Sequence, residues 1–238
     1  MAQALATPGS CRVLNCGRAL NVHGRTATGI PRSKEDLRLK IVILGPDGAG
    51  KSSVISGLLD QLNPAGFVVK MRHLKPRTVA KLRGQPEMIV VDPHGKPPRG
   101  AFLSLVKLIV WIFEEWYANF FHEKKSTLLV CDRYYHDLLV DPRRYRFGAP
   151  LWTAKLVGML MPQPKLWILL NAPAEVLQAR KQEVAPAETA RQCEAYVKFI
   201  RTRRNHAIID ASQPLDKVIT DVEQVITNAL VEREGNRE

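Results

Sequence analysis

The sequence predicts a single α/β domain over residues 37–238: a three-layer sandwich with a five-stranded, mostly parallel sheet and helices on both faces. Two observations predict this fold. Short apolar runs recur along the chain, and helix-patterned segments separate them. Strands that alternate with helices form parallel sheets covered on both faces. With 238 residues and 45% hydrophobic content, the chain can bury the core of such a domain without disulfide bonds.

The expected strands are the apolar runs at 40–44, 67–72, 127–131, 165–170 and 207–210. Helices are expected from the end of the glycine-rich turn to Leu62, and then at 101–122, 151–160, 174–180, 187–204 and 214–232. The helix at 101–122 is apolar on nearly all sides, which is typical of a helix buried in the middle of a domain. Contact with a membrane surface is the alternative for this helix.

The first 36 residues lack sustained periodicity and are expected to form a flexible leader. Residues 1–34 contain four arginines, one lysine and no acidic residue. We expect a cytoplasmic protein, and a mitochondrial one if residues 1–34 are a transit peptide. The four cysteines form no C-x-x-C pair and are expected to be reduced thiols. With no apolar stretch of 18 residues, integral membrane association is not expected.

The net charge of +12 suggests polyanionic ligands, such as nucleotides, nucleic acid or an anionic membrane surface. Nucleic acid is not an expected partner, because no recognised nucleic-acid module is present and the cations cluster around loops expected to hold phosphates. The expected partner is instead a small phosphorylated molecule. The oligomeric state is open, with a homodimer as one option.

The stretch from Gly45 to Ser52 has the spacing G-x-x-x-x-G-K-[ST] between an apolar run and a helix pattern. Glycines allow backbone N–H groups to converge on phosphate oxygens, and the N-terminus of a helix favours negative charge. This predicts a site for ATP and Mg²⁺, with a solvated glycine-rich turn as the alternative. Its expected nucleotide-binding residues are Gly45, Asp47, Gly48, Ala49, Gly50, Lys51, Ser52 and Ser53.

Lys51 and Ser52 have expected roles in catalysis and metal binding. Lys51 would neutralise the β- and γ-phosphates, and the hydroxyl of Ser52 would face Mg²⁺. Asp132 ends an apolar strand, where a parallel sheet delivers side chains to a cleft, so this carboxylate is the second expected Mg²⁺ ligand. The alternative for Asp132 is a cap on the following turn.

The expected acceptor site is rich in cations. Arg133 could clamp an acceptor phosphate, and Arg72 and Arg77 follow the second strand in a loop without a carboxylate. A kinase acting on a neutral hydroxyl needs a base near its acceptor, so this surplus of cations favours an acceptor that is already phosphorylated. Asp47 would be repelled by bound phosphates and is expected to face the acceptor, where it could bind a sugar hydroxyl. Each cation could also be an ordinary surface residue.

A mobile lid is expected at about 180–193, after the fourth strand. Arg180, Lys181 and Arg191 could neutralise charge on the transferring phosphoryl group and exclude water. Arg180 is the strongest candidate for a catalytic role. A solvated helix face is the alternative.

The chain resembles the thymidylate kinase family of nucleoside monophosphate kinases over about 39–232. The resemblance rests on four blocks in the family's order: Gly45 to Ser53, Cys131 to Tyr134, Ala172 to Arg180, and Ile209 to Ser212. It implies the P-loop NTPase fold and ATP-dependent transfer to a monophosphate. It also implies that Asp47 contacts the acceptor's sugar, that Arg133 contacts its phosphate, and that Arg180 lies over the adenine or reaches the transferred group.

Gly48 occupies a place where some members have a catalytic arginine, which resembles the subgroup that carries this charge in the lid. Two acceptor blocks differ from the family pattern. Met71 to Arg77 replaces T-R-E-P-G-G, and Tyr135 to Leu139 replaces the pattern that reads thymine. The expected function is therefore ATP-dependent phosphoryl transfer to a phosphorylated acceptor, most simply a nucleoside monophosphate. A kinase of a phosphorylated sugar or lipid-linked intermediate, or a non-catalytic nucleotide-binding module, remains an alternative.

Overall fold

A five-stranded, all-parallel sheet forms the centre of the structure, a computed structural model that describes residues 39–62, 69–73, 97–122 and 128–235. The strand order is β2-β3-β1-β4-β5. The strands are β1 (Leu39–Leu44), β2 (Val69–His73), β3 (Leu128–Asp132), β4 (Leu166–Asn171) and β5 (His206–Asp210). This confirms the predicted P-loop NTPase-like α/β class, with every strand pairing parallel.

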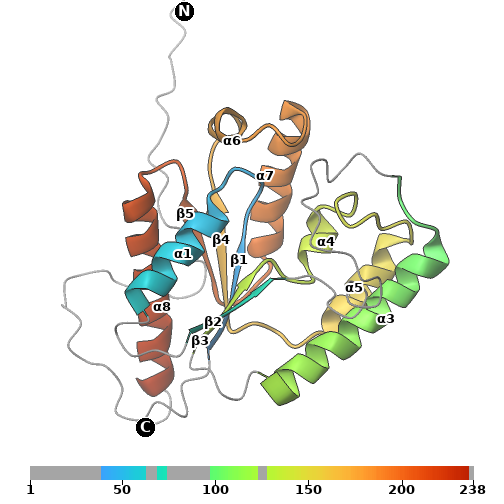
Figure 1. Ribbon diagram of the computed structural model, residues 1–238, viewed down its shortest axis with the longest axis horizontal. Helices are drawn as coiled ribbons and strands as arrows, with labels where there is room; N and C mark the ends of the chain where they lie inside the picture. The colour runs from blue at the N-terminus through green and yellow to red at the C-terminus, as the bar shows by residue number, and fades with distance from the viewer. Residues whose placement is uncertain (1–38, 63–68, 74–96, 123–127, 236–238) are drawn as a thin grey trace, which may run out of the picture.

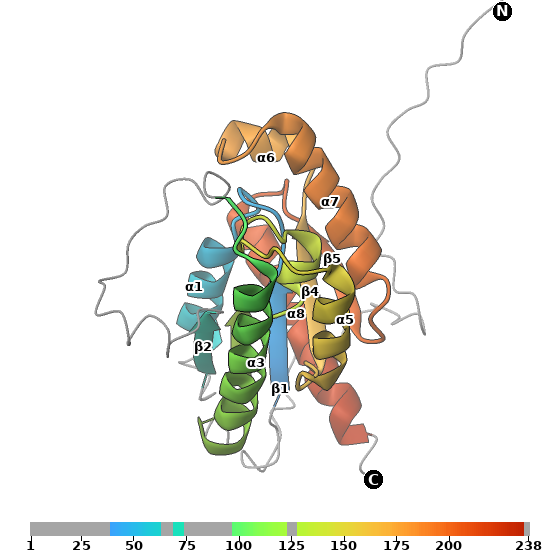
Figure 2. The ribbon, with the colours of Figure 1, turned by 90° about the vertical axis from the view of Figure 1, so that its right-hand side faces the viewer.

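Helices follow the strands and cover the sheet (Figures 1 and 2). They are α1 (Lys51–Leu62), α3 (Ala101–Tyr117), α4 (Asp137–Val140), α5 (Leu151–Leu160), α6 (Ala174–Arg180), α7 (Pro186–Ile200) and α8 (Leu215–Gly235). A short π-helix, η1 (Ala118–His122), extends α3. A helix at 137–140 was not predicted. The other predicted boundaries lie within a few residues of the observed ones when η1 is counted with α3, and the largest difference is the end of α7, predicted at 204 and observed at Ile200.

Two apolar cores flank the sheet because successive strand residues point to opposite faces. Ile41 and Ile43 pack with α1 and α8 on one face, whereas Val42 and Leu44 pack with α3, α5 and α7 on the other. Every residue of β1 is buried, as expected for the central strand of a covered parallel sheet.

The prediction that residues 101–122 form a fully buried helix is wrong. Only Ser104, Leu108, Trp111 and Glu115 of α3 are buried, while the opposite side carries large exposed apolar residues. The helix therefore covers the sheet with one face and leaves an apolar face outside. No helix among the described residues is long and apolar enough to cross a membrane.

Candidate functional site

The loop after β1 owes its shape to three glycines. Gly45, Gly48 and Gly50 have φ angles of 154°, 84° and 77°, a region that residues with a Cβ rarely adopt. A Cβ on Gly48 would lie 2.7 Å from the carbonyl oxygen of Leu177, so α6 also fixes the underside of the loop. The chain then enters α1 at Lys51, which leaves the N-terminal amides of this helix at the loop.

Lys51 folds back over the loop. Its Nζ donates hydrogen bonds of 2.7 Å to the carbonyl oxygens of both Gly45 and Pro46, and the side chain is buried. Burial lowers the pKa of Lys51 to about 7, and the charge of Arg133 adds to this effect. A bound phosphate would oppose both effects, so an anionic ligand at the loop would favour the protonated form of Lys51.

Asp47 projects from the loop to a pair of arginines. Nη2 of Arg133 lies 2.6 Å from Oδ1 of Asp47, and Arg144 binds Oδ2. Burial opposes ionisation of Asp47, yet Arg133, Arg144 and Lys51 together hold its pKa below the usual range. The carboxylate is therefore charged and neutralised within the protein.

The other edge of Arg133 is held by Asp137, the first residue of α4. Nη1 of Arg133 donates to Oδ2 of Asp137 at 2.8 Å, the hydroxyl of Tyr145 donates to the same oxygen at 2.7 Å, and the hydroxyl of Tyr196 donates to Oδ1. Asp137 is fully buried. Burial opposes its charge, and Arg133 with the two tyrosine hydroxyls outweighs burial and lowers its pKa.

Asp132 lies beside the loop because β1 and β3 are neighbours. Ile43 pairs with Asp132 in the parallel register, and the backbone N–H of Arg133 donates to the carbonyl of Ile43 at 3.2 Å. Asp132 is buried, and its charge acts on Lys51. Ser52 is exposed in the first turn of α1. The donor set of one carboxylate and one hydroxyl beside a phosphate loop fits Mg²⁺, which keeps several waters and shares substrate phosphates.

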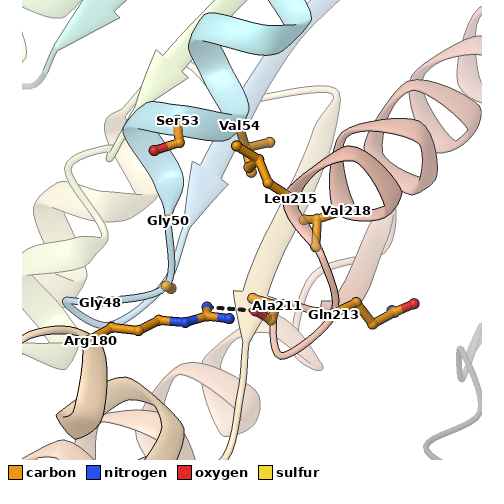
Figure 3. A pocket seen from close by; sticks show the side chains of 10 residues that line it. Gly48, Gly50, Ser53, Val54, Arg180, Ala211, Gln213, Leu215 and Val218 are labelled. Carbon is orange, nitrogen blue, oxygen red and sulfur yellow. Dashed lines mark hydrogen bonds between the residues drawn. The ribbon is translucent and has the colours of Figure 1, made fainter.

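A pocket of about 220 Å³ opens between the loop, α6 and the start of α8. Figure 3 shows Arg180 lying across it below Gly50, with Leu215 and Val218 on the opposite wall. Nη1 of Arg180 donates to the carbonyl of Ala211 at 2.7 Å. A flat guanidinium beside apolar side chains suits an aromatic ring, so this pocket fits the adenine of ATP next to the phosphate loop.

The remaining predicted site residues lie apart from this cluster or outside the described residues. Arg72 is bound to the buried Glu115 of α3, with Nη2 to Oε1 at 2.7 Å. Arg77 lies at 74–96, outside the described residues, as does the predicted leader at 1–36. In the predicted lid, Lys181 binds Glu183 at 2.5 Å and Arg191 binds Glu188 at 2.6 Å. These ion pairs account for the observed positions of both lid cations.

Sequence reasoning missed four residues of the cluster: Arg144, Asp137, Tyr145 and Tyr196. Arg144 and Tyr145 stand in a polar aromatic segment after β3, and the pattern of this segment indicates no partner for either side chain. Tyr196 comes from α7, about 60 positions from Asp137. Only the segment between 133 and 150, with its density of Arg, Tyr and Asp, carried a signal.

The fold and the loop define a P-loop NTPase-like α/β protein. Among curated proteins, the chain is similar to the thymidylate kinases of two strains of Limosilactobacillus reuteri, DSM 20016 and subsp. reuteri JCM 1112. It is 27% identical to each over 204 residues, which span 76% of this chain and 92% of the relative. No family model matches the chain. This similarity supports a relationship to thymidylate kinase-like nucleotide kinases.

Proposed function

We propose that the protein transfers the γ-phosphoryl group of MgATP to a phosphorylated small molecule, most simply a nucleoside monophosphate. One observation carries the proposal. The glycine-shaped loop that encloses Lys51 also presents Asp47 to Arg133 and Arg144, so a loop suited to phosphates is joined through Asp47 to a pair of arginines. A nucleotide bound at the loop and an anionic acceptor bound at the arginines would meet near Lys51.

Each residue has a defined part in the proposed reaction. The loop amides and Lys51 would hold the β- and γ-phosphates, and Arg180 would cover the adenine in the pocket of Figure 3. Ser52 and Asp132 would hold Mg²⁺, which when bound supplies positive charge at the phosphates. Arg133 would bind and orient the acceptor phosphate while Asp47 faces the rest of the acceptor. No general base is needed, since the acceptor oxygen already carries negative charge.

The substituted blocks leave the acceptor open within one chemical class, the phosphomonoesters. Positions 71–77 and 135–139 differ from the pattern of the thymidylate kinase family. The residue that follows Tyr135 is His136, whose imidazole is buried among Tyr134, Trp167 and Phe199, and burial lowers its pKa to about 3. This position thus contributes a neutral, packed ring to the core, which leaves dTMP and other phosphomonoesters as candidates of the same chemical class.

A coupled ADP-release assay with an acceptor panel tests the proposal. The panel contains dTMP, other nucleoside monophosphates, sugar phosphates and a polyprenyl phosphate, each with MgATP. We expect acceptor-dependent turnover with at least one phosphomonoester. In Lys51→Met the turnover should fall by at least 10³-fold, since the transition-state charge loses its principal cation. The control Lys165→Met removes an exposed lysine and should change turnover less than twofold.

Two results would reject the proposal. One is full activity in a folded Lys51→Met variant. The other is tight ATP binding by the wild-type protein with no turnover on any phosphomonoester, which would favour a non-catalytic nucleotide-binding module.

A further inference from the structure

Hydrogen bonds join the start of α3 to the segment at 143–148, between α4 and α5. The backbone N–H of Arg99 donates to the carbonyl of Arg146 at 2.9 Å, and the backbone N–H of Gly148 donates to Oγ of Ser104 at 3.0 Å. Figure 2 shows that α3 begins at the same end of the sheet as the loop after β1. These contacts therefore lie at the end of the sheet that carries the candidate site.

This contact region brings cations together. Nζ of Lys107, in the second turn of α3, donates to the backbone carbonyl of Tyr145 at 2.9 Å. Arg146 is the next residue along the chain, and its Nε donates to the carbonyl of Pro97 at 3.0 Å. Burial lowers the pKa of Lys107 to about 8, and the charges of Arg99 and Arg146 add to this effect. Like charges gathered in this way repel one another until an anion joins them.

Neither Lys107 nor Arg146 has an acidic partner in the part of the chain that the structure describes. Each uses one N–H group on a backbone carbonyl, whereas a lysine has three such groups and an arginine has five. Arg133 and Arg144, by contrast, are both paired with Asp47. The other donors of Lys107 and Arg146 are therefore left for a ligand.

Aromatic rings hold the ammonium group of Lys107 in place. Its Nζ lies 4.6 Å from the ring centre of Trp111 and 5.4 Å from that of Tyr145, and such contacts attract a cation without neutralising its charge. Nε1 of Trp111 is itself buried and has no hydrogen-bond partner among the described residues. A buried donor of this kind costs stability until an acceptor reaches it. Unneutralised charge and an unsatisfied donor thus both favour an oxygen-bearing anion at this place.

The backbone of Arg146 is a further sign of a functional site. Among the described residues other than glycine, only Arg133 and Arg146 have positive φ angles, of 66° and 51°. This region is disfavoured for a residue with a Cβ, and strained backbones gather at functional sites. Arg133 stands where the acceptor phosphate is expected to bind. Arg146, held in the same strained conformation, marks a second point of ligand contact.

A chain of contacts joins these two positions. Nη1 of Arg133 donates to Oδ2 of Asp137 at 2.8 Å, and the hydroxyl of Tyr145 donates to the same oxygen at 2.7 Å. The backbone carbonyl of Tyr145 accepts from Lys107. One tyrosine therefore has Arg133 at its hydroxyl end and Lys107 at its backbone end. A small molecule held at Arg133 by its phosphate could reach Lys107 with its other end.

We propose that Lys107 and Arg146 form a second anion-binding subsite for the acceptor, which therefore carries a carboxylate or a second phosphate besides the phosphate that Arg133 would bind. The guanidinium of Arg146 suits the paired oxygens of either group, and Lys107 adds a point charge. The proposal rests on the proposed function in one respect, the place of the acceptor phosphate at Arg133. A nucleoside monophosphate meets the requirement only if its sugar or base carries a further anionic group, and dTMP does not.

Calorimetry with small phosphate esters tests the subsite while a non-hydrolysable ATP analogue and Mg²⁺ occupy the loop after β1. Three series share alkyl chains of about two to six carbons: monophosphates, ω-carboxyalkyl phosphates and α,ω-bisphosphates. We expect at least one ester with two anionic groups to bind about tenfold more tightly than the monophosphate of the same chain length, since charge-assisted hydrogen bonds are the strong ones. The series that shows this gain identifies the second group.

Two variants and one control assign the gain to the subsite. Lys107→Met removes the charge and keeps the length of the side chain, and Arg146→Gln keeps a polar side chain. Each should lower the gain by at least about fivefold, while the affinity of the monophosphates changes less than twofold. A purely structural role would change the affinity of both kinds of ester alike. The control Lys155→Met removes an exposed lysine of α5 and should keep the gain.

The proposal is overturned if no ester with two anionic groups binds more tightly than its monophosphate, or if the gain survives in both variants. Circular dichroism checks that each variant folds, and Arg146→Gln decides the matter if Lys107→Met does not. Binding of two anionic groups that needs Lys107 and Arg146, with no turnover of any phosphomonoester, would keep the subsite and reject the reaction. Turnover of monophosphates with no gain from a second anionic group would keep the reaction and reject the subsite.

Discussion

Glu115 joins the outer helix α3 to the sheet, and its removal gives the sharpest test of how this fold is held together. The side chain is buried among two cations: Nζ of Lys40 on β1 lies 3.4 Å from Oε2, and Nη2 of Arg72 on β2 lies 2.7 Å from Oε1. The side chains of Lys40 and Glu115 are only 10% and 4% exposed. We predict that Glu115→Gln strongly destabilises the protein.

The magnitude follows from the charges that the substitution leaves behind. At an effective dielectric constant of about 20, unit charges at these two distances attract by about 5 and 6 kcal/mol. Desolvation of the buried groups offsets much of this attraction in the native protein. In Glu115→Gln the desolvation of Lys40 and Arg72 persists while the carboxylate charge is gone, so the free energy of unfolding should fall by about 3–5 kcal/mol.

Urea unfolding followed by circular dichroism measures this loss. The control is Glu194→Gln on α7, where the carboxylate is exposed and the change should stay within about 0.5 kcal/mol. A loss of less than about 1 kcal/mol in Glu115→Gln, or equal losses in the two variants, would refute the assigned role of this carboxylate. A separate variant tests the predicted place of Arg72 in the acceptor site: an effect of Arg72→Ala on the acceptor KM beyond its effect on stability would support it.

The loop and its lysine give two further predictions. Gly48→Ala places a Cβ 2.7 Å from the carbonyl oxygen of Leu177 at a φ of 84°, so the free energy of unfolding should fall by more than about 1 kcal/mol and ATP binding, measured by calorimetry, should weaken at least tenfold. The control is Gly100→Ala, which has open space around its Cβ. Equal ATP affinities of the two variants would contradict the packing argument. Because burial lowers the pKa of Lys51 from 10.5 to about 7, ATP binding at pH 8 should take up close to ~1 proton and at pH 6 only ~0.1. Calorimetry in buffers of different ionisation enthalpy measures this uptake, and a value near zero at pH 8 would contradict the lowered pKa. Folding has the opposite proton balance: the unfolded chain holds the extra proton between pH 7 and 10.5 and releases it on folding, so the cost of burying Lys51 grows, and the free energy of unfolding falls, as pH falls through that range.

The fold could be predicted because local patterns dictate it. Strands such as β1 are uninterrupted apolar runs, and the glycine spacing from Gly45 to Gly50 admits few backbone shapes. Their order along the chain then restricts the topology to a parallel sheet. The exposed side of α3 could not be predicted. A helix that is apolar on all sides has the same sequence pattern whether its second side is covered by its own chain or by a partner.

Only part of the candidate site could be predicted from the sequence, for a related reason. Lys51, Asp132 and Arg133 lie at or beyond strand ends, where the topology itself brings side chains to one edge. Tyr196 reaches Asp137 from α7, and Arg144 reaches Asp47 across the loop, so each pairing depends on packing between elements distant in sequence. Arg72 shows the same limit: its place at a strand end predicts an acceptor contact, which stays a prediction, and its ion pair with Glu115 could not be predicted from the sequence.

The central claim is that a triphosphate rests on the loop between β1 and α1, and hydrogen exchange with and without MgATP tests it most directly. Amides donated to phosphates should exchange more slowly, so peptides covering residues 45–54 should gain protection, while peptides covering 223–232 of α8 should not. This pattern should vanish in Lys51→Met at the same ATP concentration. ATP bound at saturation, as shown by calorimetry, with unchanged exchange at 45–54 would contradict the account.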